Sequence, residues 1–147
     1  MNWDEFFVGM AKYVATKSKD PSTKCGVVIV GEDNTVLGVG YNGFPRGVDD
    51  NPELYADRSI KYQRVVHAEA NAIANCARLG IRMKGATMYT SFGSNCCNEC
   101  AKLIIQSGIV AVIGEKQKET FGGGDWCESI KVGRDMFEQA GINLKEI

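Results

Sequence analysis

Two short motifs near the middle of the chain contain the side chains that could do chemistry. The first, HAE, begins at His67, and the second, CNEC, begins at Cys97. His67, the only histidine in the chain, and the thiols of Cys97 and Cys100 are three good zinc ligands. A structural zinc site usually fills its fourth position with another Cys or His, whereas a catalytic site keeps it for water. Since Glu69 is not needed as a ligand, the pattern predicts a zinc enzyme that activates water.

Two simpler interpretations compete with this one. The ion could be purely structural, or Cys97 and Cys100 could form a redox pair of the Cys-x-x-Cys type. A redox pair would need neither His67 nor Glu69, and a structural site would leave Glu69 without a role. We therefore favour a catalytic zinc site.

The two motifs must be brought together by helices. His67 and Glu69 are about 200° apart around a helix and cannot share a face within it, but both can reach one point beyond its first turn. Cys97 and Cys100 do share a face. They begin a predicted helix, where the partial positive charge of the N-terminus favours thiolates. Two helix starts converging on one ion would bring all four groups together.

Composition limits the class of protein. The chain has 147 residues, 44% of them apolar, a net charge of −1 and a pI near 5.9. This length predicts one domain over 1–147, and the charge disfavours nucleic acid as a partner. No apolar run is long enough for a membrane span, and no export signal is recognisable. Six cysteines without such a signal, two of them in Cys-x-x-Cys spacing, indicate metal binding in the cytoplasm.

Apolar periodicity and turn residues predict an alternation of strands and helices. The expected elements are a helix over 2–17, hairpin strands at 25–30 and 35–41, a short helix within 52–62, a helix over 66–80, a strand at 86–92, a helix over 97–106, a strand at 109–113, a helix over 130–141 and a closing strand at 142–144. This order predicts an α/β fold, namely a three-layer α/β/α sandwich with a mixed sheet of about five strands.

The zinc motifs resemble those of the zinc-dependent cytidine and deoxycytidylate deaminase superfamily, in which His-x-Glu is followed by Pro-Cys-x-x-Cys. This chain departs from the signature at one position, because Cys96 occupies the place of the proline. Either Cys96 or Cys97 could therefore be the first thiolate ligand. Cys97 keeps the two-residue spacer to Cys100, and we favour it.

Further segments resemble the deoxycytidylate (dCMP) deaminase branch and cover most of the chain. They are SKDPST from Ser18, GYNGFPRG from Gly40, VHAEANAI from Val66, CNECAKLII from Cys97 and MFEQAGI from Met136. The resemblance implies a cytidine deaminase-like fold and hydrolysis of dCMP to dUMP and ammonia, which supplies dUMP for thymidylate synthesis. It also implies that Glu69 transfers protons, that Asn42 holds the sugar and that backbone groups around Ala68 contact the base.

A nucleotide monophosphate also needs a cationic or hydroxyl-rich site for its phosphate. Lys17, Ser18, Thr23 and Lys24 cluster before the first predicted strand and are candidates, although a solvated helix end would explain them equally simply.

The resemblance further implies a homo-hexamer that is activated by dCTP and inhibited by dTTP, with Mg²⁺ accompanying the triphosphate. In that family the GYNGFPRG loop helps to line the effector site, which makes Asn42, Gly43, Arg46 and Gly47 candidates here. Glycine backbone and one arginine suit phosphate oxygens. An ordinary turn between a strand and a helix is the alternative.

Two other functions remain open from the sequence. One is another deaminase of the superfamily, acting on tRNA adenosine or on a free base, against which the acidic pI and the GYNGFPRG loop both argue. The other is a zinc-stabilised binding module without catalysis, which would have no use for Glu69.

Overall fold

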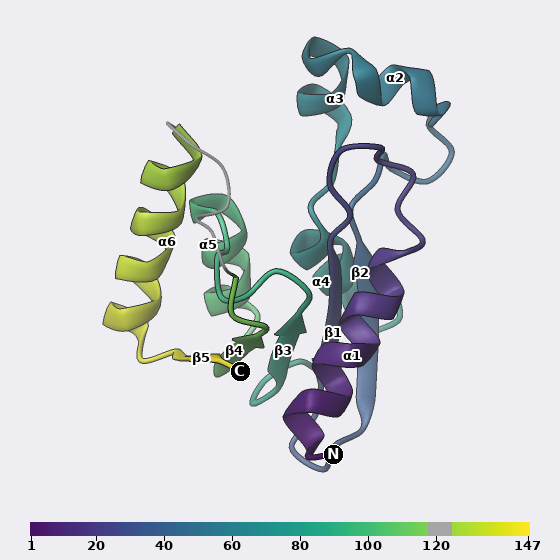
Figure 1. Cartoon of the computed structure of the whole chain (residues 1–147). Coiled ribbons are helices and arrows are strands. Elements are labelled where there is room, and N and C mark those ends of the chain that lie inside the picture. The colour runs from purple at the N-terminus through teal and green to yellow at the C-terminus, as the bar shows by residue number, and fades with distance from the viewer. Residues whose placement is uncertain (118–124) are drawn as a thin grey trace.

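A five-stranded sheet forms the centre of the computed structural model, which describes residues 1–117 and 125–147, with side chains from residue 127 onward in the second range (Figure 1). Its order is β2-β1-β3-β4-β5. The first two pairings are antiparallel and the last two are parallel. The strands are β1 (Gly26–Val30), β2 (Val36–Tyr41), β3 (Thr87–Thr90), β4 (Ala111–Gly114) and β5 (Asn143–Glu146). The predicted mixed sheet is confirmed.

Helices cover both faces of the sheet because β1 is apolar on both sides. On one face of the sheet, Val28 and Val30 pack against α1. On the other face, Val27 and Ile29 belong to the core beneath the remaining long helices. The predicted three layers are therefore present (Figure 1). The long helices are α1 (Trp3–Ala15), α4 (Ala68–Arg78), α5 (Asn98–Gln106) and α6 (Asp125–Ala140). Within the described ranges, every helix is too short or too polar to span a lipid bilayer.

Local sequence accounts for several element boundaries. Asn2 accepts a hydrogen bond from the N–H of Glu5 at 2.9 Å, and the Glu5 carboxylate accepts the N–H of Asn2 at 2.9 Å. This capping box starts α1 where the sequence predicts it. Gly80, with φ +69°, follows the end of α4. The strand predicted from residue 109 begins instead at Ala111.

The short helix predicted within 52–62 is instead two helices, α2 (Pro52–Ala56) and α3 (Arg58–Arg64). Asp57 separates them because its backbone is extended, at φ −85° and ψ 105°. Its carboxylate accepts the N–H of Ser59 at 2.9 Å and so caps α3. Both helices lie beyond one end of the sheet (Figure 1).

Candidate metal centre and active site

Helix α4 lies directly on β2 because the strand presents glycines to it. A Cβ at Gly40 would overlap the carbonyl oxygen of Ala68 and the N–H of Ala72, and one at Gly38 would stand 2.5 Å from the sulfur of Cys76. Any larger side chain would push the helix away from the sheet. The close approach therefore places the first turn of α4 beside the C-terminal end of β2.

His67 and Glu69 both belong to this first turn. His67 is the N-cap residue, with extended backbone at φ −66° and ψ 154°, and its imidazole does not cap the helix. The preceding residue is held by a bridge to Gly43, in which Val66 donates at 2.8 Å and accepts at 3.1 Å. The structure thus brings the His67 and Glu69 side chains to the same helix end, as the spacing predicts.

Helix α5 presents the two thiols in the same way. Cys97 is its N-cap residue, and the Cys97 sulfur accepts the N–H of Cys100 at 3.4 Å. Cys100 follows in the first turn and is 3% exposed. Because α4 and α5 lie side by side, their positive N-terminal ends face the same region (Figure 1).

The three predicted ligands meet between these helix ends. Nδ1 of His67 lies 3.4 Å from the sulfur of Cys97 and 3.5 Å from that of Cys100. All three ligand atoms lie within 4.8 Å of one another. Tetrahedral zinc, with Zn–N near 2.0 Å and Zn–S near 2.3 Å, would separate nitrogen and sulfur by about 3.5 Å. One nitrogen and two sulfur donors at these separations fit a tetrahedral zinc ion with one position left for water.

Electrostatics at the thiols also favours a cation. Hydrogen bonds from Cys100 and, less strongly, from His67 lower the pKa of the Cys97 thiol to about 4, although burial opposes them. The hydrogen bond to Cys97 raises the pKa of Cys100, and burial and the charge of Glu69 add to this. One thiolate thus forms readily in the protein alone, while the second needs a cation to ionise.

Glu69 lies against this group and is only 5% exposed. Burial raises its pKa above the usual range, and the nearby charge of His67 opposes that rise. A buried carboxyl with a raised pKa is suited to accepting and returning protons.

Cys96 is separated from the three ligands by its orientation. It is 0% exposed, and its thiol lies next to the Glu69 carboxyl. Burial raises the pKa of the Cys96 thiol well above the ordinary value, which keeps it a neutral donor. The structure therefore groups Cys97, and not Cys96, with His67 and Cys100. Sequence gave no sign of the contact with Glu69, because it depends on which way the loop turns.

Asn42 follows β2 and is hydrogen-bonded to the segment before β1. Its Oδ1 accepts the N–H of Cys25 at 2.8 Å, and its Nδ2 donates to the carbonyl of Thr23 at 2.8 Å. Its own carbonyl accepts the hydroxyl of Ser18 at 2.8 Å. The side chain that the resemblance assigns to the sugar is thus held in place by the segment before β1.

A buried ion pair anchors the same segment and was not predicted. Asp20, 1% exposed, accepts the ammonium of Lys61 on α3 at 2.7 Å. It also accepts the N–H of Ser22 at 2.8 Å and, more weakly, Nδ2 of Asn42 at 3.4 Å. Burial acts to raise the pKa of Asp20, but Lys61 and the backbone donors outweigh it and hold that pKa below the usual range. Residues so far apart in sequence leave no local signal for such a pair.

Replacing Lys61 with methionine should lower the free energy of unfolding by on the order of 3 kcal/mol near pH 7, because it leaves a buried carboxylate without its ion pair. A carboxyl whose folded pKa is depressed stabilises the protein above its unfolded pKa, and this contribution disappears as pH falls through the folded pKa. The deficit of the variant should therefore shrink below about pH 4.

Urea unfolding of the Lys61 variant and the wild type, near pH 7 and below about pH 4, measures this difference in stability. Lys19→Met is the matched control, since it breaks the exposed pair with Asp50, whose side chains are 53% and 44% exposed. That control should leave the free energy of unfolding close to that of the wild type. Equal losses in the two variants would contradict the role of the buried pair.

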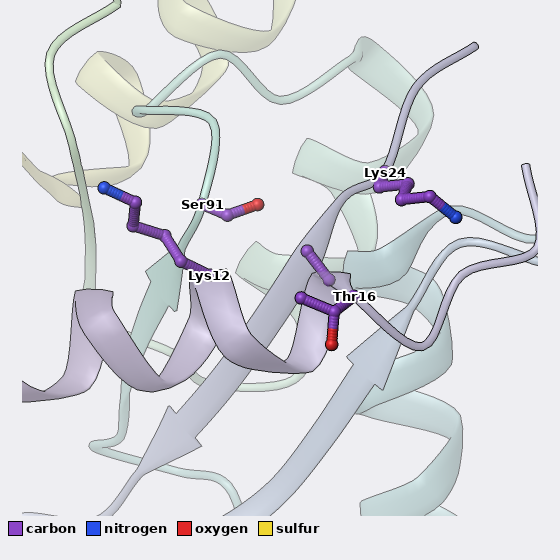
Figure 2. A pocket seen from close by; sticks show the side chains of 5 residues that line it. Lys12, Thr16, Lys24 and Ser91 are labelled. Carbon is purple, nitrogen blue, oxygen red and sulfur yellow. The ribbon is translucent and has the colours of Figure 1, made fainter. Parts of the chain in front are cut away.

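Contacts connect three of the four phosphate candidates around Asn42, where the carbonyl of Thr23 accepts Nδ2 of Asn42 at 2.8 Å. Ser18 is buried and its hydroxyl donates to the carbonyl of Asn42, while Lys17 is exposed. Lys24 donates to the carbonyl of Ser18, and its ammonium points away from Ser91 (Figure 2).

Lys24 also borders a hollow of about 270 Å³, together with Lys12, Ala15, Thr16 and Ser91 (Figure 2). The polar groups there have protein partners. Lys12 pairs with Glu115 at 2.9 Å, the Thr16 hydroxyl donates to the carbonyl of Tyr13 at 2.7 Å, and Ser91 accepts the N–H of Gly26 at 2.9 Å.

The four effector candidates do form one loop next to the site. Gly43 bridges to Val66, the residue before His67. Arg46 is exposed and donates to Oδ1 of Asn75 at 2.7 Å, and Gly47 has φ +80°. Phe44 stacks on Tyr55 of α2 with ring centroids 4.2 Å apart. The loop is thus attached both to α2 and to the start of α4.

A mixed five-stranded α/β/α sandwich that presents His, Cys and Cys around a buried glutamate defines the class of zinc-dependent deaminases. Residues 1–115 match the sequence profile described as the cytidine and deoxycytidylate deaminase zinc-binding region. The chain belongs to the cytidine and deoxycytidylate deaminase family.

Similar proteins agree along nearly the whole chain. A deoxycytidylate deaminase of Mus musculus is 38% identical, over 99% of this chain and 80% of the mouse protein. An uncharacterized deaminase of Aliivibrio fischeri is 40% identical, over 97% of this chain and 91% of that protein. The crystal structure of the dCMP deaminase of cyanophage S-TIM5 superposes with a TM-score of 0.75 at 22% identity, covering 98% of this chain and 96% of the phage protein, and shows the same fold.

Proposed function

We propose that this protein hydrolyses dCMP to dUMP and ammonia within one deaminase domain over residues 1–147. The observation that carries the proposal is the buried Glu69 beside the group formed by His67, Cys97 and Cys100. The deoxycytidylate deaminase relative of Mus musculus supports the choice of nucleotide. A binding module would gain nothing from a buried carboxylate with a raised pKa at this position.

We infer that His67, Cys97 and Cys100 hold Zn²⁺, with water at the fourth position. When bound, zinc supplies Lewis-acid activation of that water for attack on C4 of the cytosine ring. Glu69 accepts the proton that the water loses and passes it to N3 of the ring. Glu69 then takes the second proton from the hydroxyl now bonded to C4 and gives it to the amine. The bond from C4 to nitrogen breaks with loss of ammonia, and the C4 carbonyl of dUMP forms.

Substrate binding is proposed for residues around the same helix end. Backbone groups at Ala68, which is fully buried beside Glu69, contact the base. An amide oxygen accepts two hydrogen bonds, so Oδ1 of Asn42 can accept a sugar hydroxyl in addition to the N–H of Cys25. Thr23 and Lys24, together with Lys17 and Ser18, remain the candidates for the phosphate; of the two lysines, Lys24 is the one that adjoins Asn42 through the Thr23–Cys25 backbone.

We also propose regulation in a cytoplasmic homo-hexamer, with dCTP activating, dTTP inhibiting and Mg²⁺ accompanying the triphosphate. The support is the loop that contains Asn42, Gly43, Arg46 and Gly47. Its bridge to Val66 offers a direct connection between a bound effector and the start of α4. An exposed arginine next to a glycine suits triphosphate oxygens.

One experiment tests substrate and regulation together. Turnover of dCMP, CMP, cytidine, cytosine and a tRNA anticodon stem is measured with and without dCTP and dTTP, each with Mg²⁺. We expect dCMP to be preferred over each of the others by at least about tenfold, which corresponds to a difference of about 1.4 kcal/mol. We expect dCTP to raise and dTTP to lower the rate. Preference for the RNA would contradict the proposed substrate. A rate that responds to neither dCTP nor dTTP would contradict only the proposed regulation.

A further inference from the structure

One face of α6 lies against the segment from Ser94 to Asn98, which carries Cys97. The hydroxyl of Ser129 accepts the N–H of Asn98 at 3.0 Å and donates to Oδ1 of Asn98 at 2.8 Å. One turn further along α6, a Cβ at Gly133 would stand 2.6 Å from the carbonyl oxygen of Cys96. The helix backbone therefore touches the peptide that precedes the proposed ligand, and a glycine inside a helix was the available sequence signal.

Arg134, the next residue of α6, holds the other end of this segment. Its Nη2 donates to Oγ of Ser94 at 3.0 Å, to Oδ1 of Asn95 at 2.9 Å and to Oε1 of Glu146 at 3.2 Å. The Ser94 hydroxyl in turn donates to the same oxygen of Glu146 at 3.1 Å. Ser94 is 1% exposed. One guanidinium thus ties α6, the segment and the last strand, β5, together.

These contacts from α6 and β5 lie beside Cys96, where the backbone lacks the restraint that a proline would impose. A proline before the first cysteine would fix its own φ near −65°. Cys96 has no such restriction, and its thiol must also face Glu69 while the next residue turns its sulfur toward His67. Opposite orientations of Cys96 and Cys97 require a segment with one conformation. The contacts from α6 and β5 supply that constraint from outside.

We propose that Arg134 is a positioning residue for the zinc site, acting through Ser94 and Asn95 on the orientation of Cys97. The proposal rests on the ligand role of Cys97 under the proposed function. Groups that orient metal ligands without touching the metal typically change metal affinity by 10- to 100-fold when they are removed. Arg134 should therefore affect how long zinc is retained more than it affects the stability of the zinc-free chain.

The test compares zinc release from the full-length zinc-loaded protein to a colour-forming chelator. Arg134→Met should release zinc roughly tenfold faster or more. Arg134→Lys should lie between it and the wild type, because the ammonium keeps the positive charge but ends a shorter side chain than the guanidinium that reaches both the Ser94–Asn95 segment and β5. Lys131→Met removes a positive charge from an exposed position of the same helix and should leave release unchanged.

Melting temperatures of the zinc-free proteins separate positioning from general stability. The proposal fails if Arg134→Met releases zinc within twofold of Lys131→Met, or if its only effect is a lower melting temperature without zinc. Should that variant not fold, Glu146→Gln tests the same network, with a smaller expected acceleration of about threefold. A wild-type protein that binds no stoichiometric zinc would instead overturn the proposed function.

Discussion

Glu69→Gln is expected to bind zinc and fold like the wild type but to lose turnover of dCMP by about 10²- to 10⁴-fold, the usual contribution of a general acid and base. Glutamine has the shape of glutamate, but at neutral pH its amide can neither take a proton from water nor return one to the amine. Because Glu69 is not among the three grouped ligands, the metal content should remain close to one ion per chain. Steady-state kinetics together with metal analysis measure both quantities.

A control on the neighbouring helix accompanies this variant. Glu99→Gln makes the same chemical change at an exposed position of α5, where the carboxylate pairs with Lys102 at 2.8 Å and is 73% exposed. That variant should keep its activity. Nearly full activity in Glu69→Gln would show that the proton transfer has been assigned to the wrong residue.

The second large effect is expected from the two adjacent cysteines. Cys97→Ser removes a thiolate whose sulfur lies 3.4 Å from Nδ1 of His67. It should weaken zinc binding by well over the roughly 100-fold that is typical when a residue contacting a ligand, but not the metal, is removed. Cys96→Ser should retain stoichiometric zinc and, because a hydroxyl can still donate to Glu69, should keep turnover within about tenfold. Metal analysis after dialysis distinguishes the two.

The paired design makes the outcome unambiguous. Zinc retained in Cys97→Ser and lost in Cys96→Ser would exchange the roles of the two residues. Cys96→Ala then isolates the contact of the thiol with Glu69, because alanine should leave zinc in place and removes only the thiol. Since this carboxylate is buried, loss of its donor should reduce turnover by about tenfold.

The order of the elements was predictable because it follows from local rules. Apolar periodicity distinguishes strands from helices, and residues such as Asn2 and Gly80 begin or end helices through hydrogen bonds and backbone angles of their own neighbourhood. The break at Asp57 was missed, since an aspartate can continue a weak helix or cap a new one, and the choice depends on where the chain must go.

The proposed catalytic group could be predicted from the sequence for a similar reason. HAE has a spacing that converges on one ion only at the start of a helix, and CNEC places two thiols on one helix face, so the chemistry could be inferred before the helices were placed. By contrast, the contacts of Asp20 with Lys61 and of Arg134 with Ser94 join distant parts of the chain. Nothing local distinguishes these side chains from solvated surface charges.

The sequence by itself therefore determined the fold class, the chemistry and most of the group that performs it, because local spacing and residue type are sufficient for each. Only the tertiary structure decided which of Cys96 and Cys97 turns toward His67 and which toward Glu69. The physical reason is that both residues are cysteines, and the spacer to Cys100 favours Cys97 as a ligand without fixing where either thiol points. The helix α6 and the strand β5 contact the segment that carries both cysteines, and these contacts join parts of the chain that are far apart in sequence.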